Sequence, residues 1–293
     1  MTPPITMIGM SGPVSKLAAI EPVPLDDFPV SNAALEWVMS AQDGPNTFTS
    51  GTSHDLSDTR PTVYSGDWTS SQTMTRSSYT NSSGDTRYYY YLPNGSNLRT
   101  SSNTSSNSDV SSNGFTFYIS MIPYSSGTGF VRPWNYYGLA NGSSTTVAGN
   151  TDEFDGPLFF MRRGRTDLQY RRPPNNNNNG DYAFTASGSV AYGTDRTFSI
   201  VIQQSTNGNA KYWIRGKAWS GTVYDTIDAT SFGFTGSGYY GIRSGTNTAV
   251  PVFADAYYNF ANHTGIMESG FGNKAYTDSE CEDLVDYLNN KYA

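Results

Sequence analysis

Hydrophobic and polar residues alternate along several short stretches of the chain, and this pattern predicts β-strands. In residues 114–123, GFTFYISMIP, every second residue from Phe115 to Met121 is apolar, and the residues between them are Thr, Tyr and Ser. A period of two is typical of a strand with one buried face and one exposed face. Residues 196–204 repeat this pattern. The Asn207-Gly208 pair that follows, before residues 210–219, is a strong hairpin signal.

Further strand-like stretches recur at short intervals along the chain. They are residues 157–163, 166–172, 182–192, 238–243 and 250–261. Tracts rich in Ser and Asn separate them, as in residues 98–113 and 173–181, and their composition is that of surface loops. Many short strands with polar connections are typical of a sandwich. We therefore predict one all-β, antiparallel β-sandwich that occupies residues 31–293.

The C-terminal stretch has a helical period instead. Thr277 and Glu280 have the spacing of a capping box. Apolar residues follow at helical spacing: Cys281, Leu284, Val285 and Leu288. We predict a helix over residues 278–290 whose apolar stripe packs against the outside of the sandwich. Cys281 lies on that stripe, so a buried structural thiol is a better interpretation than a reactive one.

The order of these stretches resembles the concanavalin A-like/laminin G-like jelly-roll family. In that family a closing helix recurs, and this chain matches it at Ser279, Glu280, Leu284, Tyr287, Leu288, Lys291 and Tyr292. The resemblance covers roughly residues 35–293. It implies a jelly roll with its closing helix. It implies no single function, because this fold carries lectins, glycosidases, adhesion modules and viral structural domains.

Composition limits the classes of partner. The formal net charge of −7 argues against nucleic acid as the main partner. The N-terminus lacks the features of a signal peptide, and no stretch is apolar enough to span a membrane, so we expect folding in a host cytoplasm. Cys281 is the single cysteine, which excludes an internal disulfide. The Asn-x-Ser/Thr sequons are expected to occur by chance in such an Asn- and Ser-rich chain.

Residues 1–30 contain six prolines and scattered apolar residues, which favour an extended arm over a helix. We predict that this arm anchors the protein to a capsid or tail protein. The alternative is that the arm wraps around its own domain. The residues predicted to contact the partner are Ile5, Met7, Ile8, Met10, Val14, Leu17 and Ile20.

No catalytic constellation is evident. Polysaccharide-cleaving enzymes of the resembled fold carry an alternating Glu/Asp run, whereas the nearest cluster here is Asp152, Glu153 and Asp155 in NTDEFDG. His54 and His263 lie among polar residues without metal-ligand spacing. We therefore expect no enzymatic activity and no cofactor. The three acids could alternatively bind Ca²⁺ through oxygen ligands, although a solvated turn is the simpler interpretation.

Two surface clusters are candidates for recognition. Residues 130–142 carry aromatic, cationic and amide side chains in what the pattern indicates is a loop, and we predict a glycan-binding surface there or a cover for one end of the sandwich. Its candidate residues are Arg132, Trp134, Asn135, Tyr136 and Tyr137. A second cluster is either a surface that binds an acidic partner or the solvent-facing polar side of two facing strands. It comprises Arg162, Arg163, Arg165, Arg171 and Arg172.

An arm, a polar sandwich and no catalytic set together resemble a bacteriophage virion accessory protein. The resemblance implies a non-enzymatic capsid decoration or head-fibre protein, located in the virion. A tail-fibre adhesin that binds host polysaccharide is the second interpretation, and a polysaccharide hydrolase or lyase of the same fold is the third. The sequence leaves homo-oligomerisation open.

Overall fold

The computed structural model describes the chain in segments. They are residues 28–30, 35–56, 67–92, 98–100, 114–123, 130–137, 158–162, 168–171, 182–184, 193–205, 210–231, 250–253, 264–272 and 274–293. The side chains of Glu36, of residues 99–100, and of the strands within 130–184 and 250–253 are outside the description. The predicted strand at residues 238–243 also lies outside the described residues.

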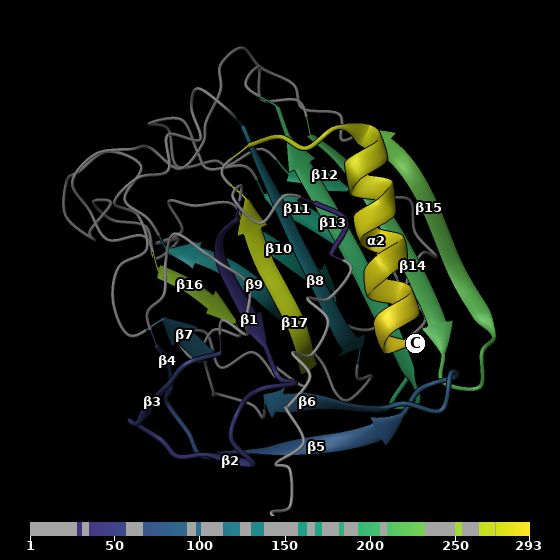
Figure 1. Cartoon of the computed structure of the whole chain (residues 1–293). Coiled ribbons are helices and arrows are strands. Elements are labelled where there is room, and N and C mark those ends of the chain that lie inside the picture. Colours follow the sequence, from purple (N-terminus) through teal and green to yellow (C-terminus); the bar gives the residue numbers. More distant parts are fainter. Residues whose placement is uncertain are drawn as a thin grey trace, which may run out of the picture.

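Within the described residues, the strands form two antiparallel sheets (Figure 1). The nine-stranded sheet contains β1 (Leu35–Ser40), β2 (Thr47–Phe48), β5 (Met74–Thr80), β6 (Thr86–Leu92), β8 (Phe115–Pro123), β13 (Arg196–Gln204), β14 (Ala210–Ala218), β15 (Val223–Ser231) and β17 (Thr264–Gly272). The eight-stranded sheet contains β3 (Ser53–His54), β4 (Trp68–Ser70), β7 (Leu98–Thr100), β9 (Phe130–Tyr137), β10 (Leu158–Arg162), β11 (Leu168–Arg171), β12 (Tyr182–Phe184) and β16 (Val250–Phe253).

The strand pairing confirms the predicted all-β sandwich. The nine-stranded sheet has the order β15-β14-β13-β8-β17-β6-β5-β2. Strand β1 lies off this path and pairs with residues 268–272 of β17. The hairpin predicted around Asn207-Gly208 joins β13 to β14, with Gln204 opposite Ala210. The eight-stranded sheet has the order β12-β11-β10-β9-β16-β7-β4-β3. Non-sequential neighbours in both sheets mean that the chain crosses repeatedly between them.

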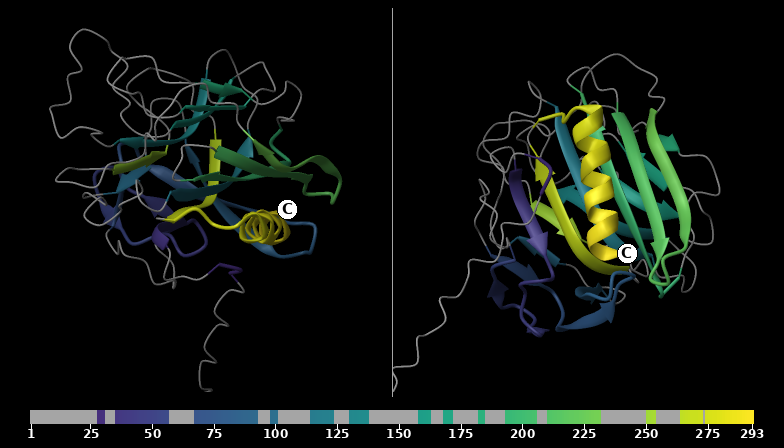
Figure 2. Two further views of the ribbon diagram at one scale, coloured as in Figure 1. Left: turned by 90° about the horizontal axis from the view of Figure 1, so that it is seen from above. Right: turned by 45° about the vertical axis from the view of Figure 1, so that its right-hand side comes forward.

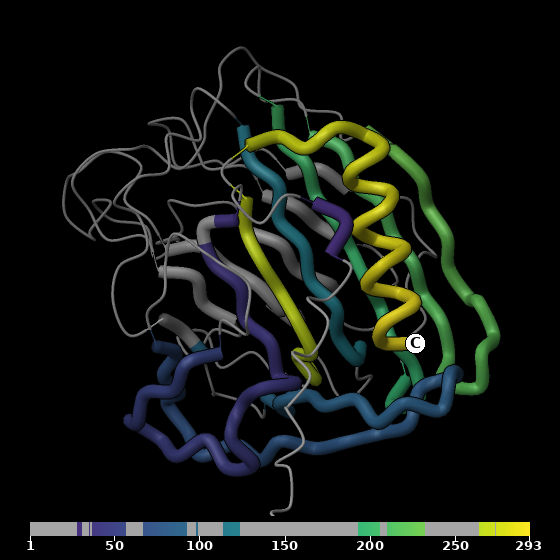
Figure 3. The backbone as a smooth tube through the Cα atoms, viewed as in Figure 1, coloured from purple at the N-terminus to yellow at the C-terminus, as the bar shows by residue number. Residues whose placement is uncertain are grey.

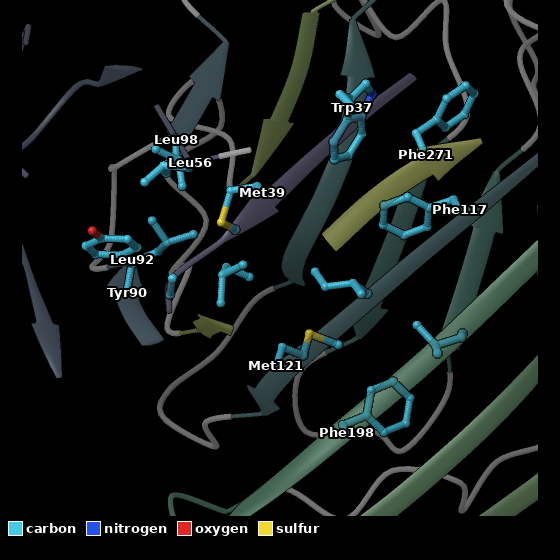
Figure 4. Close-up of a cluster of buried hydrophobic side chains, with 14 of the residues drawn as sticks. Trp37, Met39, Leu56, Tyr90, Leu92, Leu98, Phe117, Met121, Phe198 and Phe271 are labelled. Atoms are coloured by element: carbon cyan, nitrogen blue, oxygen red, sulfur yellow. The ribbon is translucent and has the colours of Figure 1, made fainter. Parts of the chain in front are cut away.

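The main hydrophobic core lies between the two sheets (Figure 4). From β8, Phe117 and Met121 point into it, and Phe198 of β13 joins them. Trp37 of β1 stacks on Phe271 of β17, with ring centroids 6.2 Å apart. The alternating pattern placed Phe117, Met121 and Phe198 on a buried face, and the structure confirms this. Trp37 and Phe271 lie on strands that the sequence analysis did not single out.

The expectation of half-buried strands is wrong for β8 and β13, and β17 and most of β14 are buried on both faces as well. The residues between the apolar positions of β8 are buried as well, including Tyr118 and Ser120. A second apolar cluster covers this outer face, built from the helix α2 (Asp278–Tyr292) and from Phe28 and Val30. Figure 2 shows α2 on the side of the nine-stranded sheet turned away from the other sheet. The period of two identified the strands but could not show that a third layer buries their polar side.

The helix α2 forms where it was predicted and runs two residues further. The Thr277 hydroxyl accepts from the Glu280 backbone N–H, and the Glu280 carboxylate accepts from the Thr277 backbone N–H. The Thr277 N–H lowers the pKa of the Glu280 carboxyl. Cations of β14 bind the acidic side of the helix, with Lys211 2.6 Å from Asp278. The apolar stripe is buried, and Cys281 with it, as the sequence predicted.

A β-bulge in β17 turns two consecutive side chains toward α2. Ile266 is opposite Met121 and Glu268 is opposite Ser120, so Met267 is an extra residue in β17. Such an insertion disrupts the strict alternation of a strand. Met267 joins the apolar cluster under the helix, and Glu268 bonds to the helix. The bulge therefore places a carboxylate in a buried layer.

We expect Gly270→Ala to destabilise the protein by about 1–3 kcal/mol, because the Tyr118 side chain already fills the space beside Gly270. Gly270 is opposite Tyr118, and an added Cβ would lie 2.4 Å from the Tyr118 hydroxyl oxygen. Urea denaturation of the variant measures the cost. The same substitution in a Tyr118→Ala background should cost much less, because the ring is then absent. An equal cost in both backgrounds would show that the clash is not the cause.

Candidate functional site

The predicted anchoring arm meets the sandwich beside α2. Residues 1–27, including all the predicted partner contacts from Ile5 to Ile20, lie outside the described residues. Of the remainder, Phe28 packs against Tyr118 and Tyr287, with ring centroids 5.8 and 5.5 Å apart. Val30 is buried in the same apolar cluster. Phe28 and Val30 are therefore part of the folded domain, which limits the predicted arm to the residues before them.

The predicted aromatic loop is a strand in the structure, so its placement was wrong. Residues 130–137 form β9, which lies between β10 and β16 in the eight-stranded sheet. Trp134 is opposite Phe159 and Val131 is opposite Met161, so two β9 residues lie between positions that only one β10 residue separates. Pro133 lies in this irregular part of the pairing, where proline is tolerated. Glycan binding by Arg132, Trp134, Asn135, Tyr136 and Tyr137 stays a prediction, because their side chains are outside the description.

The two charged clusters of the sequence are described only in part. Asp152, Glu153 and Asp155 lie outside the described residues, so the predicted calcium site stays a prediction. Of the arginines, Arg162 and Arg171 lie on β10 and β11, which pair with each other as expected of two facing strands. Arg162 is at the end of β10 that precedes the β10–β11 connection, whereas Arg171 is opposite Leu158 at the other end. The backbone therefore separates these two arginines along the hairpin.

His54 and Cys281 are engaged in packing. The His54 ring packs against Phe48 at 4.6 Å and lies 3.0 Å from the Thr52 hydroxyl. Burial raises the pKa of the Cys281 thiol, so the thiol stays protonated and poorly nucleophilic. His263 lies outside the described residues. Among the residues that the structure does describe, no group of three or more His, Cys, Asp or Glu side chains could hold a metal ion.

Polar and aromatic side chains meet at a described surface that we call the turn junction and define as residues 79–85 and 217–222. It joins the β5–β6 turn to the β14–β15 turn, beside the C-terminal end of α2 (Figure 3). Gly84 and Gly221 have φ values of 87° and 92°, which only glycine adopts without strain. The Asn81 carboxamide oxygen accepts from the backbone N–H groups of Ser83 and Asp85, at 3.1 and 2.8 Å.

Hydrogen bonds hold the turn junction together. The Lys217 ammonium donates to the Ser82 hydroxyl at 3.0 Å, and that hydroxyl donates to the Ala293 carbonyl at 2.7 Å. The Asn81 side-chain amide donates to the Lys291 carbonyl at 3.1 Å. Asn81 is buried and bonded in this way, which agrees with the view that its sequon is a chance occurrence. Strand β14, the β5–β6 turn and the helix end are thereby tied into one unit.

A stacked aromatic pair lies within the turn junction. The Trp219 indole is parallel to the Tyr79 ring, with centroids 4.1 Å apart and planes inclined by 12°. Tyr79 is buried, and its hydroxyl donates to the Tyr292 carbonyl. Burial raises the pKa of the Tyr79 phenol, so this hydroxyl stays a donor. Trp219 is half-buried and forms the outer member of the pair.

Behind the junction, a buried polar network fastens α2 to the sheet. The Glu268 carboxylate is fully buried and accepts from the Lys291 ammonium at 3.0 Å and from the Tyr292 hydroxyl at 2.6 Å. The Lys291 ammonium also donates to the Tyr287 hydroxyl at 3.0 Å. Because helix and sheet seal this carboxylate from solvent, it is a structural group and offers no site to a substrate.

Sequence reasoning did not single out the turn junction. Its members come from segments more than 130 residues apart, such as Ser82 and Lys217. One local signal was available in the sequence. Trp219 is followed by Ser-Gly, which predicts a turn. A large apolar side chain in a turn is unusual and marks a position to inspect for function.

The comparisons with known proteins concern the fold. No protein-family model matches the chain, and no curated protein matches it. The binding domain of botulinum neurotoxin serotype D is similar in structure, with a TM-score of 0.50, 11% sequence identity, and coverage of 86% of this chain and 53% of that chain. The binding domain of botulinum neurotoxin DC in complex with SialylT has a TM-score of 0.46, 12% identity, and coverage of 85% and 52%.

A carbohydrate esterase from the Shiga toxin-encoding bacteriophage phi24B is also similar, with a TM-score of 0.44, 10% identity, and coverage of 82% of this chain and 99% of that chain. The chain spans about half the length of the toxin domains. At 11% identity, the similarity to the serotype D domain shows an all-β fold and nothing of function. None of these comparisons confirms the more specific concanavalin A-like assignment. Within the described residues, no helix is long and apolar enough to cross a membrane.

Proposed function

We propose that this protein is a non-enzymatic bacteriophage virion surface protein, a capsid decoration or head-fibre protein that its N-terminal arm anchors and whose sandwich is displayed for recognition. The observation that carries the proposal is the packing of Phe28 and Val30 under α2. A proline-rich arm with apolar residues precedes this point. An arm that is packed firmly against the domain where the two join can hold the domain on the partner that the arm binds. The prolines of the arm lower the entropy lost on binding.

Two further observations support a recognition role without catalysis. The serotype D toxin domain, which is named as a binding domain, shares the all-β fold, although this chain covers only 53% of it. The described Cys281, His54 and Glu268 are all engaged in packing or internal hydrogen bonds. These positions therefore do not offer a nucleophile or a base to a substrate.

Deleting residues 1–27 tests the anchor. We expect the shortened protein to keep its melting temperature, because Phe28 and Val30 remain in place, and to lose binding to virions. Co-sedimentation with virions that lack the protein measures the binding. Deleting residues 1–30 is the matched control: it should also lower stability, since each buried apolar side chain contributes about 1.5–3 kcal/mol. If the protein without residues 1–27 still bound to virions, the anchor would be refuted.

A tail-fibre adhesin that binds host polysaccharide is the second candidate function. The aromatic and hydroxyl-rich surface of the turn junction favours it. Separating heads from tails after disruption of the virion distinguishes the two candidates. Recovery of the chain with heads supports decoration, and recovery with tails supports the adhesin.

A further inference from the structure

The Trp219 indole is half-buried and stacked on Tyr79, and it offers the aromatic surface on which a sugar ring can stack. Tyr79 stacks on the inner face, and no other ring contacts Trp219 among the residues that the structure describes. Its Nε1 atom is buried and, within the same residues, has no hydrogen-bond partner. Any part of the indole that solvent reaches is therefore carbon. An aromatic carbon surface next to polar groups suits a ligand with both an apolar face and hydroxyl groups.

Hydrogen-bonding groups lie on the same two turns. Lys217 is two residues before Trp219, and both reach the same hairpin: Lys217 contacts Ser82 and Trp219 contacts Tyr79. An ammonium has three donors, and Ser82 takes one of them. Lys217 forms no ion pair within the described parts of the chain, so its remaining donors are available to a ligand. Both turns also carry exposed residues with hydroxyl groups, namely Ser82, Ser83, Ser220 and Thr222.

The platform is preorganised. The β5–β6 turn is closed by the Asn81 side chain and fixed to the helix end through Ser82 and Ala293. The β14–β15 turn is fixed by the backbone bond from Gly221 to Ala218, at 2.8 Å, and by the bond from the Trp219 N–H to the Asp195 carbonyl, at 2.9 Å. Groups held in place by the fold lose little entropy when a ligand binds.

We propose that the turn junction is a saccharide-binding site for a neutral pyranose. The sugar ring stacks its C–H face on Trp219, and its hydroxyl oxygens accept from Lys217 and bond to Ser82 and its neighbouring hydroxyls. A neutral sugar fits better than an acidic one, because the chain carries a net charge of −7 and the Lys217 ammonium is already shared with Ser82. The inference rests on the recognition role proposed above and assigns that role to a surface outside β9.

Binding to immobilised galactose-, glucose- and mannose-terminated oligosaccharides tests the site in the full-length chain. We expect Trp219→Ala and Lys217→Met each to reduce affinity by at least about tenfold, as truncation of a central binding residue does. Lys211→Met is the matched control, since Lys211 lies on the same strand and bonds to Asp278 at the other end of α2. It should leave affinity unchanged.

The purely structural alternative is that Trp219 only covers Tyr79. Comparing Trp219→Phe with Trp219→Leu separates the two roles. A phenyl ring can cover Tyr79 and also stack on a sugar, whereas a leucine side chain can cover Tyr79 but stacks poorly on a sugar. Retained binding with Phe and lost binding with Leu, at equal melting temperatures, supports the site. No binding of the full-length chain to any of the three oligosaccharide classes, or equal binding by all variants, would overturn it.

The same measurements keep this inference separate from the proposed virion function. The protein without residues 1–27 should still bind the oligosaccharides, because the turn junction lies entirely within the sandwich. The Trp219→Ala variant should still bind to virions through the arm. Loss of both activities in either variant would contradict the assignment of anchoring and saccharide binding to different parts of the chain.

Discussion

Leu288→Ala is expected to lower the free energy of unfolding by about 2–5 kcal/mol, the cost of truncating a fully buried leucine. Leu288 lies on the inner stripe of α2 and is fully buried in the apolar cluster beneath the helix. The helix packs chiefly across β13 and β14. A cavity there would loosen the layer that also holds Phe28 and Val30. Urea denaturation followed by circular dichroism measures the change.

Val223→Ala is the control for this experiment. Val223 is 60% exposed on the edge strand β15, so its truncation should change stability by no more than about 0.5 kcal/mol. Leu284→Ala should resemble Leu288→Ala, since Leu284 is fully buried on the same stripe. If both leucine variants unfolded at the midpoint of the unchanged protein, α2 would not be an integral part of the sandwich.

Lys291→Met is expected to cost about 3–5 kcal/mol, because it leaves a buried carboxylate without its cation. The Glu268 side chain is 0% exposed and the Lys291 side chain is 10% exposed, so neither charge can turn to water without opening the helix. The bulge in β17 fixes Glu268 in this layer. Thermal and urea denaturation at constant pH measure the loss.

Two further variants separate the buried charge from the packing of the lysine chain. In the double variant Glu268→Gln with Lys291→Met, no uncompensated charge remains, so much of the stability should return. Lys211→Met breaks the exposed pair with Asp278 and should cost about 0–1 kcal/mol. A cost for Lys291→Met as small as that for Lys211→Met would show that the pair beneath α2 is not effectively buried.

Local sequence patterns predicted the secondary structure of several segments. The helix at 278–290 was predictable because the capping box and the apolar stripe are both encoded within about four turns of chain. The strands at 115–123 and 196–204 were predictable because alternation is also local. Residues 130–137 were placed in a loop because aromatic residues, proline and asparagine gave no clear period, whereas pairing with β10 and β16 makes them a strand.

The sequence alone determined the fold class, the two-stranded hairpin at Asn207-Gly208, the closing helix and the burial of Cys281, because each depends on neighbours within a few positions of the chain. Only the tertiary structure decided that a third layer buries the outer face of β8, that a bulge brings Glu268 to Lys291, and that Ser82 meets Lys217 beside Trp219. These contacts join residues far apart in sequence. They depend on strand order and on a one-residue shift of register, and neither leaves a periodic trace in the amino-acid sequence.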